Sequence, residues 1–153
     1  MRYKEIEGDL FTADTDNLLV HCISADFALG AGIARTFRYR YGVRDKLLAT
    51  GNKNNWTGSG YCIITESSEN GEPAWDVANL VTKGRCYGKP TYDTLRQALV
   101  DLKRQCSSKG YSRISMPLIG CGLDGLSWGR VSEIIKDVFA DYNGEITVYS
   151  YQK

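Results

Sequence analysis

Short apolar segments alternate along the chain with longer segments in which apolar residues recur at helical spacing. The short segments predict strands at residues 3–6, 17–23, 61–65, 75–81, 112–118 and 145–149. The longer segments predict a helix that ends near residue 41 and further helices at 43–50, 91–109 and 127–139. Strands that alternate with helices are typical of an α/β fold, in which helices cover both faces of a central sheet.

Polar residues and glycines predict where these elements end. Thr91 and Ser127 are suitable N-caps for the last two helices. Gly42, Gly51 and Gly110 are suitable stops for the first three helices.

The loops complete the predicted architecture. Residues 51–60 are turn formers and predict a surface loop. Asn70-Gly71 favours a hairpin between the strands at 61–65 and 75–81, so the sheet is expected to be mixed. No repeat, low-complexity segment or linker interrupts the pattern, and we expect a single domain over residues 1–153.

The composition is that of an ordinary globular domain. Of the 153 residues, 42% are hydrophobic and 24% are charged, which suits one hydrophobic core. The net charge is +1, so no overall field steers the chain onto nucleic acid or acidic membranes. No apolar segment is long enough to cross a membrane, and the charged N-terminus lacks an apolar signal segment. We therefore expect no membrane contact and an intracellular location, in the cytoplasm or, in a eukaryote, the nucleus.

Cysteine and histidine offer no recognisable metal site or catalytic relay. The five cysteines include no CxxC pair, and we interpret them as reduced, mostly buried thiols. The single histidine, His21, leaves no second imidazole for a nucleophile–base pair. Scattered cysteines with one histidine do not form a zinc ligand set. We expect neither a metal ion nor a cofactor.

Two glycine loops, Gly30-Ala31-Gly32 and Gly120-Cys121-Gly122, each follow a predicted strand and precede a predicted helix. Glycine allows backbone N–H groups to turn toward an anion, and the following helix adds its positive dipole. Ligands of α/β sheets bind at the carboxyl ends of strands, where both loops should lie. Together the loops predict a diphosphate held from both sides; each loop alone is equally interpretable as a tight turn. Residues 120–125 also match GxGxxG, but the next strand does not end on an acidic residue, so we reject a dinucleotide fingerprint.

Several short motifs run in order from residue 8 to about residue 149. They are Gly8-Asp9-Leu10-Phe11, His21-Cys22-Ile23-Ser24, Gly30 to Ala34, Thr82-Lys83, Lys89-Pro90-Thr91-Tyr92, Met116-Pro117, Ile119 to Asp124, and Trp128. Together they resemble a macrodomain, specifically the terminal ADP-ribose–protein glycohydrolase branch. The resemblance implies a three-layer macrodomain with a mixed central sheet. It also implies that ADP-ribose binds, without a cofactor, in a cleft at the strand ends.

The resemblance assigns binding roles to individual residues. Asp9, followed by Leu10, would accept a hydrogen bond from the adenine amine. Ile23 and Ser24 would form the pocket floor near the ribose. The loops around the distal ribose and diphosphate would be Gly30, Ala31, Gly32 and Ile33 on one side and Ile119, Gly120, Cys121, Gly122 and Leu123 on the other.

Lys83 and Asp124 match the catalytic pair of this branch. The resemblance implies that Lys83 attacks the anomeric carbon of the distal ribose and forms a covalent adduct. It implies that Asp124 protonates the departing carboxylate and later helps to release the adduct. The amine attacks only when deprotonated, which partial burial or nearby cations such as Lys89 or Arg85 would favour. Without the resemblance, Lys83 is interpreted as a solvated lysine, and Asp9 and Asp124 as turn residues.

The sequence departs from other macrodomain branches. Many macrodomain hydrolases carry Asn-Ala-Ala-Asn where this chain has His21-Cys22-Ile23-Ser24, which argues against the water-activating branch. The chain also lacks the ligand set of zinc-dependent macrodomains. Residues 51–60, 66–73 and 85–88 match the most similar branch poorly, so the resemblance leaves the substrate linkage open.

Three functions fit these observations. We expect the first, an enzyme that removes mono-ADP-ribose from acidic side chains of proteins and acts as a monomer. The second is a related enzyme: an O-acetyl-ADP-ribose deacetylase, an ADP-ribose 1″-phosphatase or a DNA de-ADP-ribosylase. The third is a binding-only reader of ADP-ribose, which would not need Lys83 and Asp124.

The segment from residue 35 to residue 44 is rich in arginine and bears on whether nucleic acid is a binding partner. Arginines at 35, 38, 40 and 44 interleave with aromatic residues at 37, 39 and 41. This pattern is typical of an amphipathic helix with solvated arginines, or of a surface for nucleic acid. The second interpretation would allow ADP-ribosylated nucleic acid as a partner.

Overall fold

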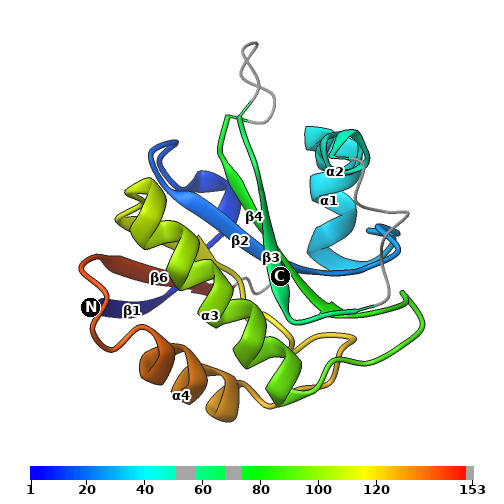
Figure 1. The fold of residues 1–153 in the computed structure, drawn as a ribbon. Coiled ribbons are helices and arrows are strands. Elements are labelled where there is room, and N and C mark those ends of the chain that lie inside the picture. Colours follow the sequence, from blue (N-terminus) through cyan, green and yellow to red (C-terminus); the bar gives the residue numbers. More distant parts are fainter. Residues whose placement is uncertain (51–57, 68–73, 151–153) are drawn as a thin grey trace.

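The computed structural model describes residues 1–50, 58–67 and 74–150 (Figure 1). In these ranges, six strands form one sheet in the order β1–β6–β5–β2–β4–β3. The strands are β1 (Arg2–Glu7), β2 (Leu18–Ser24), β3 (Tyr61–Thr65), β4 (Val77–Lys83), β5 (Arg113–Met116) and β6 (Glu145–Ser150). Neighbouring strands are parallel except β3, which runs antiparallel to β4. The predicted mixed sheet is confirmed; the turn at 70–71 and most of the loop at 51–60 lie outside the described residues.

Helices cover both faces of the sheet. They are the 3-10 turn η1 (Leu10–Thr12) and the α-helices α1 (Gly32–Tyr41), α2 (Val43–Ala49), α3 (Tyr92–Lys109) and α4 (Trp128–Val138). One hydrophobic core lies under α3 and α4, and a second lies under α1 and α2. Leu18 of β2 belongs to the first core and Leu19 to the second, as alternating side chains require. In the described ranges, no helix has the length and apolar character needed to cross a membrane.

In the described ranges the helix ends follow the sequence signals with one exception; Gly51, the stop expected for α2, lies outside these ranges. Thr91 caps α3, and its hydroxyl accepts a backbone N–H of the first turn at 3.1 Å. Gly42 and Gly110 end α1 and α3 with φ angles of 66° and 81°, which glycine adopts at low cost. Ser127 stands at the N-cap of α4, but its side chain makes no cap hydrogen bond. The Ser127 N–H instead donates to the Tyr92 hydroxyl at 2.9 Å, so the prediction of a side-chain cap there is wrong.

β3 has the predicted bounds, β1, β2 and β6 differ by one residue at one or both ends, and β4 and β5 differ most. β4 extends to Lys83 because Lys83 pairs with Ser24 of β2 across an irregularity in the register. β4 begins after Trp75, whose ring packs in the second core and donates to a main-chain carbonyl at 3.1 Å. β5 ends at Met116 because Pro117 has no N–H for the sheet. The extension of β4 places Lys83 on the sheet itself, at its edge.

The single histidine is a core residue. His21 is fully buried, and its Nε2 lies 2.6 Å from Oδ1 of Asn79. The ring centre of His21 lies 4.1 Å from that of Phe37. Burial lowers the pKa of His21 to about 4, although the hydrogen bond with Asn79 opposes the shift. His21 is therefore neutral in the folded protein, and because its ring is fully buried in the core it does not reach a substrate at the surface.

We expect the free energy of unfolding to fall as the pH is lowered from about 7 to 5. In this range the unfolded chain binds a proton at His21 and the folded chain does not, so protonation favours unfolding. The lowered pKa of His21 predicts a loss of about 2 kcal/mol over this range. Urea unfolding of wild type and His21→Gln should show this slope in the wild type and a flatter one in the variant. Equal slopes would contradict the account.

Candidate functional site

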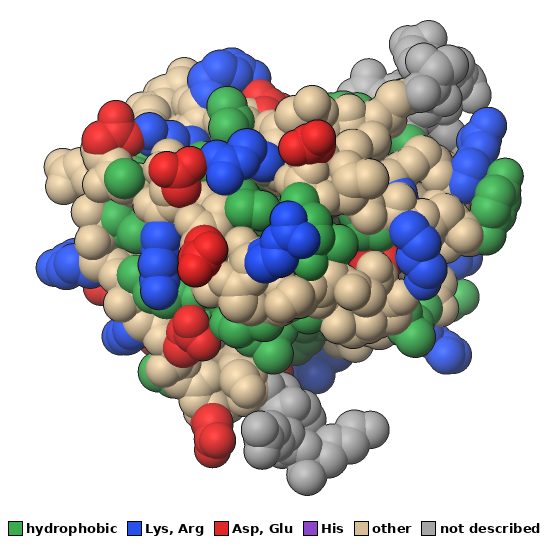
Figure 2. All heavy atoms as spheres, turned by 90° about the horizontal axis from the view of Figure 1, so that it is seen from below, with side chains coloured by type: hydrophobic (Ala, Val, Ile, Leu, Met, Phe, Trp, Pro, Cys, Tyr) green, Lys and Arg blue, Asp and Glu red, His purple; other side chains and the backbone are tan. Residues whose placement is uncertain are grey.

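The candidate site lies at the edge of the sheet where the parallel strands β2, β4 and β5 end. The loops that follow these strands are residues 25–31, 84–91 and 117–127; in Figure 1 the first lies on the right beside α1 and the other two lie below it. Figure 2 looks onto this edge from below and shows Lys and Arg side chains interspersed with hydrophobic ones on its right half. Both glycine loops therefore lie at the edge where α/β sheets bind ligands.

Lys83 and Asp124 form an ion pair at this edge. Lys83 Nζ lies 2.7 Å from Asp124 Oδ1, although 41 residues separate the two in sequence. The side chains are only 16% and 19% exposed, so the pair is largely shielded from water. Shielding strengthens their attraction, and the contact places a proton acceptor directly on the amine. The structure thus brings together the two residues that the sequence analysis paired.

The first glycine loop presents backbone N–H groups at the surface. Gly30, Ala31 and Gly32 are exposed, and Ile33 is half-buried. Ala31 is the N-cap of α1 and has no side-chain acceptor for the first N–H groups of the helix. Gly32 adopts a φ of 58°, which favours glycine. These N–H groups and the positive end of α1 are available to an anion.

The second glycine loop closes on itself as a compact turn. The Leu126 N–H donates to the Gly120 carbonyl at 2.8 Å, and the Gly125 N–H donates to the Gly122 carbonyl at 3.1 Å. Gly120 adopts a φ of 75°, and a Cβ there would lie 3.0 Å from Leu126 Cδ1. The positive φ favours glycine at this position. Asp124 lies inside both hydrogen-bonded turns, which hold its backbone in place.

The predicted ligand residues differ in exposure. Leu10, Ile23 and Ile119 are buried side chains of the hydrophobic cores. Ser24 is buried at the end of β2, while Gly120 and Cys121 are half-buried and Gly122 and Leu123 are exposed. A ligand at this edge would therefore meet the glycine loops directly and the three core residues mainly through their backbone.

Asp9 lies at the opposite end of this edge, beyond β1. Its carboxylate is exposed, and Oδ1 accepts the Phe11 N–H at 3.0 Å as the N-cap of η1. Three strands lie between β1 and β4, so at the usual strand spacing roughly 19 Å separates the ends of the two. Asp9 thus caps the η1 turn through Oδ1, while among the described residues its Oδ2 has no hydrogen-bond partner. Its contact with adenine stays a prediction.

Two contacts tie the loops to one another. Lys89 Nζ donates to the Leu123 carbonyl at 2.5 Å, one residue before Asp124. Asp26 accepts hydrogen bonds from the Ser24 hydroxyl and from the backbone N–H of Cys86. The sequence analysis did not single out Asp26. The Ser-x-Asp spacing directly after a strand, typical of side chains that bond their own loop, was the available signal.

Two cysteines near the ion pair are protonated thiols. Burial, together with the negative charge of Asp124, raises the pKa of Cys22 to about 12. Burial also raises the pKa of Cys121. Because the thiolate is the reactive form, neither is suited to act as a nucleophile. In the described ranges, no three His, Cys, Asp or Glu side chains are placed to hold a metal ion.

Comparison with known families identifies the chain. Residues 20–135 match the family described as “Macro domain”, which is more than half of the chain. The chain belongs to the Macro domain family. Two curated relatives of this macrodomain are described as “ADP-ribose glycohydrolase OARD1”, one from Bos taurus at 40% identity and one from Homo sapiens at 38%. Each alignment spans 149 residues and covers 97% of this chain and 91% of the relative.

Solved structures agree with the fold of this macrodomain. The structure described as “Macrodomain of Mycobacterium tuberculosis DarG” is 22% identical, covers 96% of both chains and superposes with a TM-score of 0.84. At this identity the similarity shows the fold alone. It confirms the predicted three-layer α/β macrodomain.

The arginines of α1 and α2 make two kinds of contact in this macrodomain. Arg38 and Arg44 donate to main-chain carbonyls of the loop after β2, at 2.8 Å each. Arg35 and Arg38 also lie over the ring of Tyr39, with guanidinium carbons 5.6 and 4.7 Å from its centre. Tyr39 is 67% exposed. Two of the arginines therefore support the loop, and an exposed Arg–Tyr surface remains on α1.

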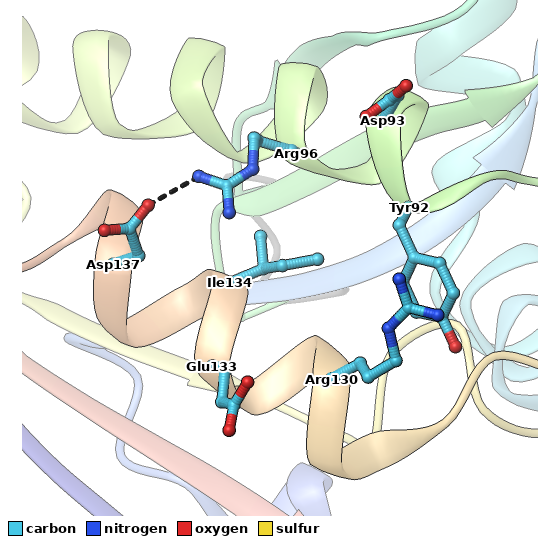
Figure 3. A pocket seen from close by; sticks show the side chains of 7 residues that line it. All are labelled: Tyr92, Asp93, Arg96, Arg130, Glu133, Ile134 and Asp137. Carbon is cyan, nitrogen blue, oxygen red and sulfur yellow. Dashed lines mark hydrogen bonds and ion pairs between the residues drawn. The ribbon is translucent and has the colours of Figure 1, made fainter.

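One hollow of the macrodomain surface lies away from the ion pair, between α3 and α4 (Figure 3). Its volume is about 400 Å³, and it is lined by Tyr92, Asp93, Arg96, Arg130, Glu133, Ile134 and Asp137. Arg130 lies 3.9 Å from the centre of the Tyr92 ring, and Arg96 is 2.6 Å from Asp137. None of the predicted ligand residues lines this hollow, so we do not assign ADP-ribose to it.

Proposed function

We propose that this macrodomain is an ADP-ribosyl hydrolase that removes mono-ADP-ribose from acidic side chains of proteins. The observation that carries the proposal is the shielded contact of 2.7 Å between Lys83 Nζ and Asp124 Oδ1, beside two glycine loops. The two relatives described as ADP-ribose glycohydrolases support hydrolysis of an ADP-ribose linkage, and the acidic side chain is the expectation from the sequence. A binding-only reader needs the loops but not this pair.

The proposed ligand lies along the edge of the sheet. The adenine stands near Asp9, the diphosphate between the two glycine loops, and the distal ribose over Lys83. The exposed N–H groups at Gly30 to Gly32 and the positive end of α1 suit a diphosphate. An extended nucleotide fits the roughly 19 Å from β1 to β4 at the usual strand spacing.

The first step uses the contact that the pair already makes. Lys83 passes a proton to Asp124, and the neutral amine attacks C1″ of the distal ribose. The new N–C1″ bond forms as the C1″–O bond to the modified glutamate breaks. The electron pair leaves with the glutamate carboxylate, which takes the proton from Asp124.

The second step frees the lysine. Asp124, again a carboxylate, accepts a proton from water, and the resulting hydroxide adds to C1″. The N–C1″ bond breaks, and the Lys83 nitrogen takes up the proton from Asp124. The products are ADP-ribose and the unmodified glutamate, and the Lys83–Asp124 pair returns to its starting state.

A substrate panel tests the proposal. It contains ADP-ribose linked to glutamate, serine or thymidine, O-acetyl-ADP-ribose, and ADP-ribose 1″-phosphate. We expect the fastest release from the glutamate-linked substrate, at a rate unchanged by EDTA, because no metal takes part in the steps above. Calorimetric binding of ADP-ribose without release from any of the five would favour a reader and contradict the proposal.

ADP-ribosylated nucleic acid is the second candidate substrate. The observation that favours it is the exposed Tyr39 ring, flanked by Arg35 and Arg38 on α1. Aromatic rings stack on bases and arginines pair with phosphates. Faster release from the thymidine-linked substrate than from the glutamate-linked one would favour this candidate. The intracellular location and monomeric state expected from the sequence stay predictions.

We expect Asp9→Ala to weaken ADP-ribose binding by about 1.5–3 kcal/mol, the usual contribution of a hydrogen bond to a charged acceptor. The same change should reduce discrimination against an inosine analogue, which lacks the adenine amine. Calorimetry on folded wild type and variant measures both effects. Thermal unfolding is the control, because Asp9 also caps η1. An unchanged affinity would remove Asp9 from the binding site.

A further inference from the structure

Asp26, two residues beyond the end of β2, joins the loops that follow β2 and β4. Its Oδ1 accepts the Ser24 hydroxyl at 2.6 Å and the Ala28 N–H at 3.2 Å. Its Oδ2 accepts the Cys86 N–H at 2.8 Å, although 60 residues separate the two. The carboxylate is half-buried and connects three points of the candidate site.

These contacts require an ionised carboxylate, because both oxygens act as acceptors. Burial alone would raise the pKa of Asp26, but hydrogen bonds from Ser24, Cys86 and Ala28 outweigh it and lower the pKa below its ordinary value. Asparagine has nearly the same shape but one acceptor oxygen and one NH₂ group. The Asp26→Asn variant could therefore accept hydrogen bonds from the loop after β2 or from the loop after β4, but not from both.

The contact with Cys86 constrains the backbone that carries Lys83. Ser24 pairs with Lys83 in the sheet, and the Ala25 N–H donates to the Lys83 carbonyl at 2.8 Å. Cys86 follows three residues later and is bound to Asp26. Residues 24–26 therefore bind the backbone both at Lys83 and at Cys86. These contacts fix the path of the backbone on which the Lys83 side chain stands.

The contact with Ala28 supports the segment that leads into the first glycine loop. Phe27 and Leu29 adopt φ angles of 55° and 44°, a region that non-glycine residues rarely occupy. Such a backbone persists only where surrounding contacts over-determine it. Arg38 of α1 and Arg44 of α2 donate to carbonyls of this segment, and Asp26 accepts an N–H of it.

We propose that Asp26 is a positioning residue of the hydrolase. It sets the Lys83 backbone and the first glycine loop in the relative arrangement that attack on the distal ribose requires. Asp26 acts through the N–H groups of Cys86 and Ala28 and does not touch the reacting atoms. The inference rests on the proposed function, because its effect is on the step carried out by Lys83.

Single-turnover release from glutamate-linked ADP-ribose, at saturating enzyme, compares wild type with Asp26→Asn and Asp101→Asn. Asp101 is the matched control: it is 20% exposed and accepts the Cys62 N–H at 2.8 Å, between α3 and β3. We expect Asp26→Asn to lower the rate at least about tenfold, since small misplacements of reacting groups are costly. The release rate of Asp101→Asn should stay within about twofold of the wild-type rate, even if this variant loses as much Tm as Asp26→Asn.

Two results would overturn the proposal: a wild-type rate in Asp26→Asn, or a fall in both variants in proportion to their loss of Tm. A wild-type protein that releases no ADP-ribose in the same assay would instead contradict the proposed function. Hydrogen exchange gives a readout that needs no activity. The Cys86 amide should be protected in wild type and lose protection in Asp26→Asn. Free exchange of this amide in wild type would also overturn the proposal.

Discussion

A Lys83→Arg variant should bind ADP-ribose but release none from a modified glutamate. Arginine keeps the positive charge and the ion pair with Asp124, but its guanidinium does not deprotonate and cannot attack C1″. We expect the release rate to fall on the order of 10³-fold or more, as for removal of a nucleophile from an enzyme. Single-turnover assays with the glutamate-linked substrate, together with calorimetry on ADP-ribose, measure the two effects separately.

Lys103→Arg is the matched control for this experiment. Lys103 also pairs with an aspartate, Asp141, and its side chain is 27% exposed, but it lies on α3 away from the candidate site. The control should release ADP-ribose at the wild-type rate. Release by Lys83→Arg at the rate of the control would refute the covalent mechanism and favour activation of water.

An Asp124→Asn variant should fail at a different step. Asparagine keeps a hydrogen bond to Lys83 but cannot accept a proton from water, which the second step requires. In the first step, solvent can take the proton of Lys83, and a carboxylate can leave without being protonated, so this step is slowed less. General acid–base catalysis contributes roughly 10²–10⁴-fold, and we expect turnover to fall by this factor. A burst of released glutamate followed by slow turnover would indicate that the step that frees the lysine is impaired. Asp137→Asn, an exposed aspartate at the hollow of Figure 3, is the control and should behave as wild type.

Local patterns in the sequence predicted the elements of the fold well. Helical periodicity and the cap residues Thr91 and Gly110 located α3, because both signals act within a few residues. Strand–loop–helix order also placed the two glycine loops at one edge of the sheet, since parallel strands bring their carboxyl ends together. The pairing of Lys83 with Asp124 came instead from the family resemblance, because no local pattern links residues that lie 41 positions apart.

The features that were missed depend on contacts between distant segments. β4 extends to Lys83 only because of an irregular register with β2, which the apolar pattern does not encode. Arg38 and Arg44, expected to be solvated, bind carbonyls of the loop after β2. Asp26 binds the N–H of Cys86 across 60 residues. Such hydrogen bonds follow from the folded geometry rather than from spacing along the chain.

The central claim is that Lys83 becomes covalently bonded to the distal ribose. Intact mass spectrometry of Asp124→Ala after incubation with glutamate-linked ADP-ribose tests it most directly. In this variant solvent can still take the proton of Lys83, but no carboxylate activates water for the second step, so the adduct should accumulate. We expect one added ADP-ribose, mapped by peptide analysis to Lys83 and absent from the Lys83→Arg/Asp124→Ala double variant. An unmodified Asp124→Ala protein that still releases glutamate from the substrate, or an adduct on another residue, would contradict it.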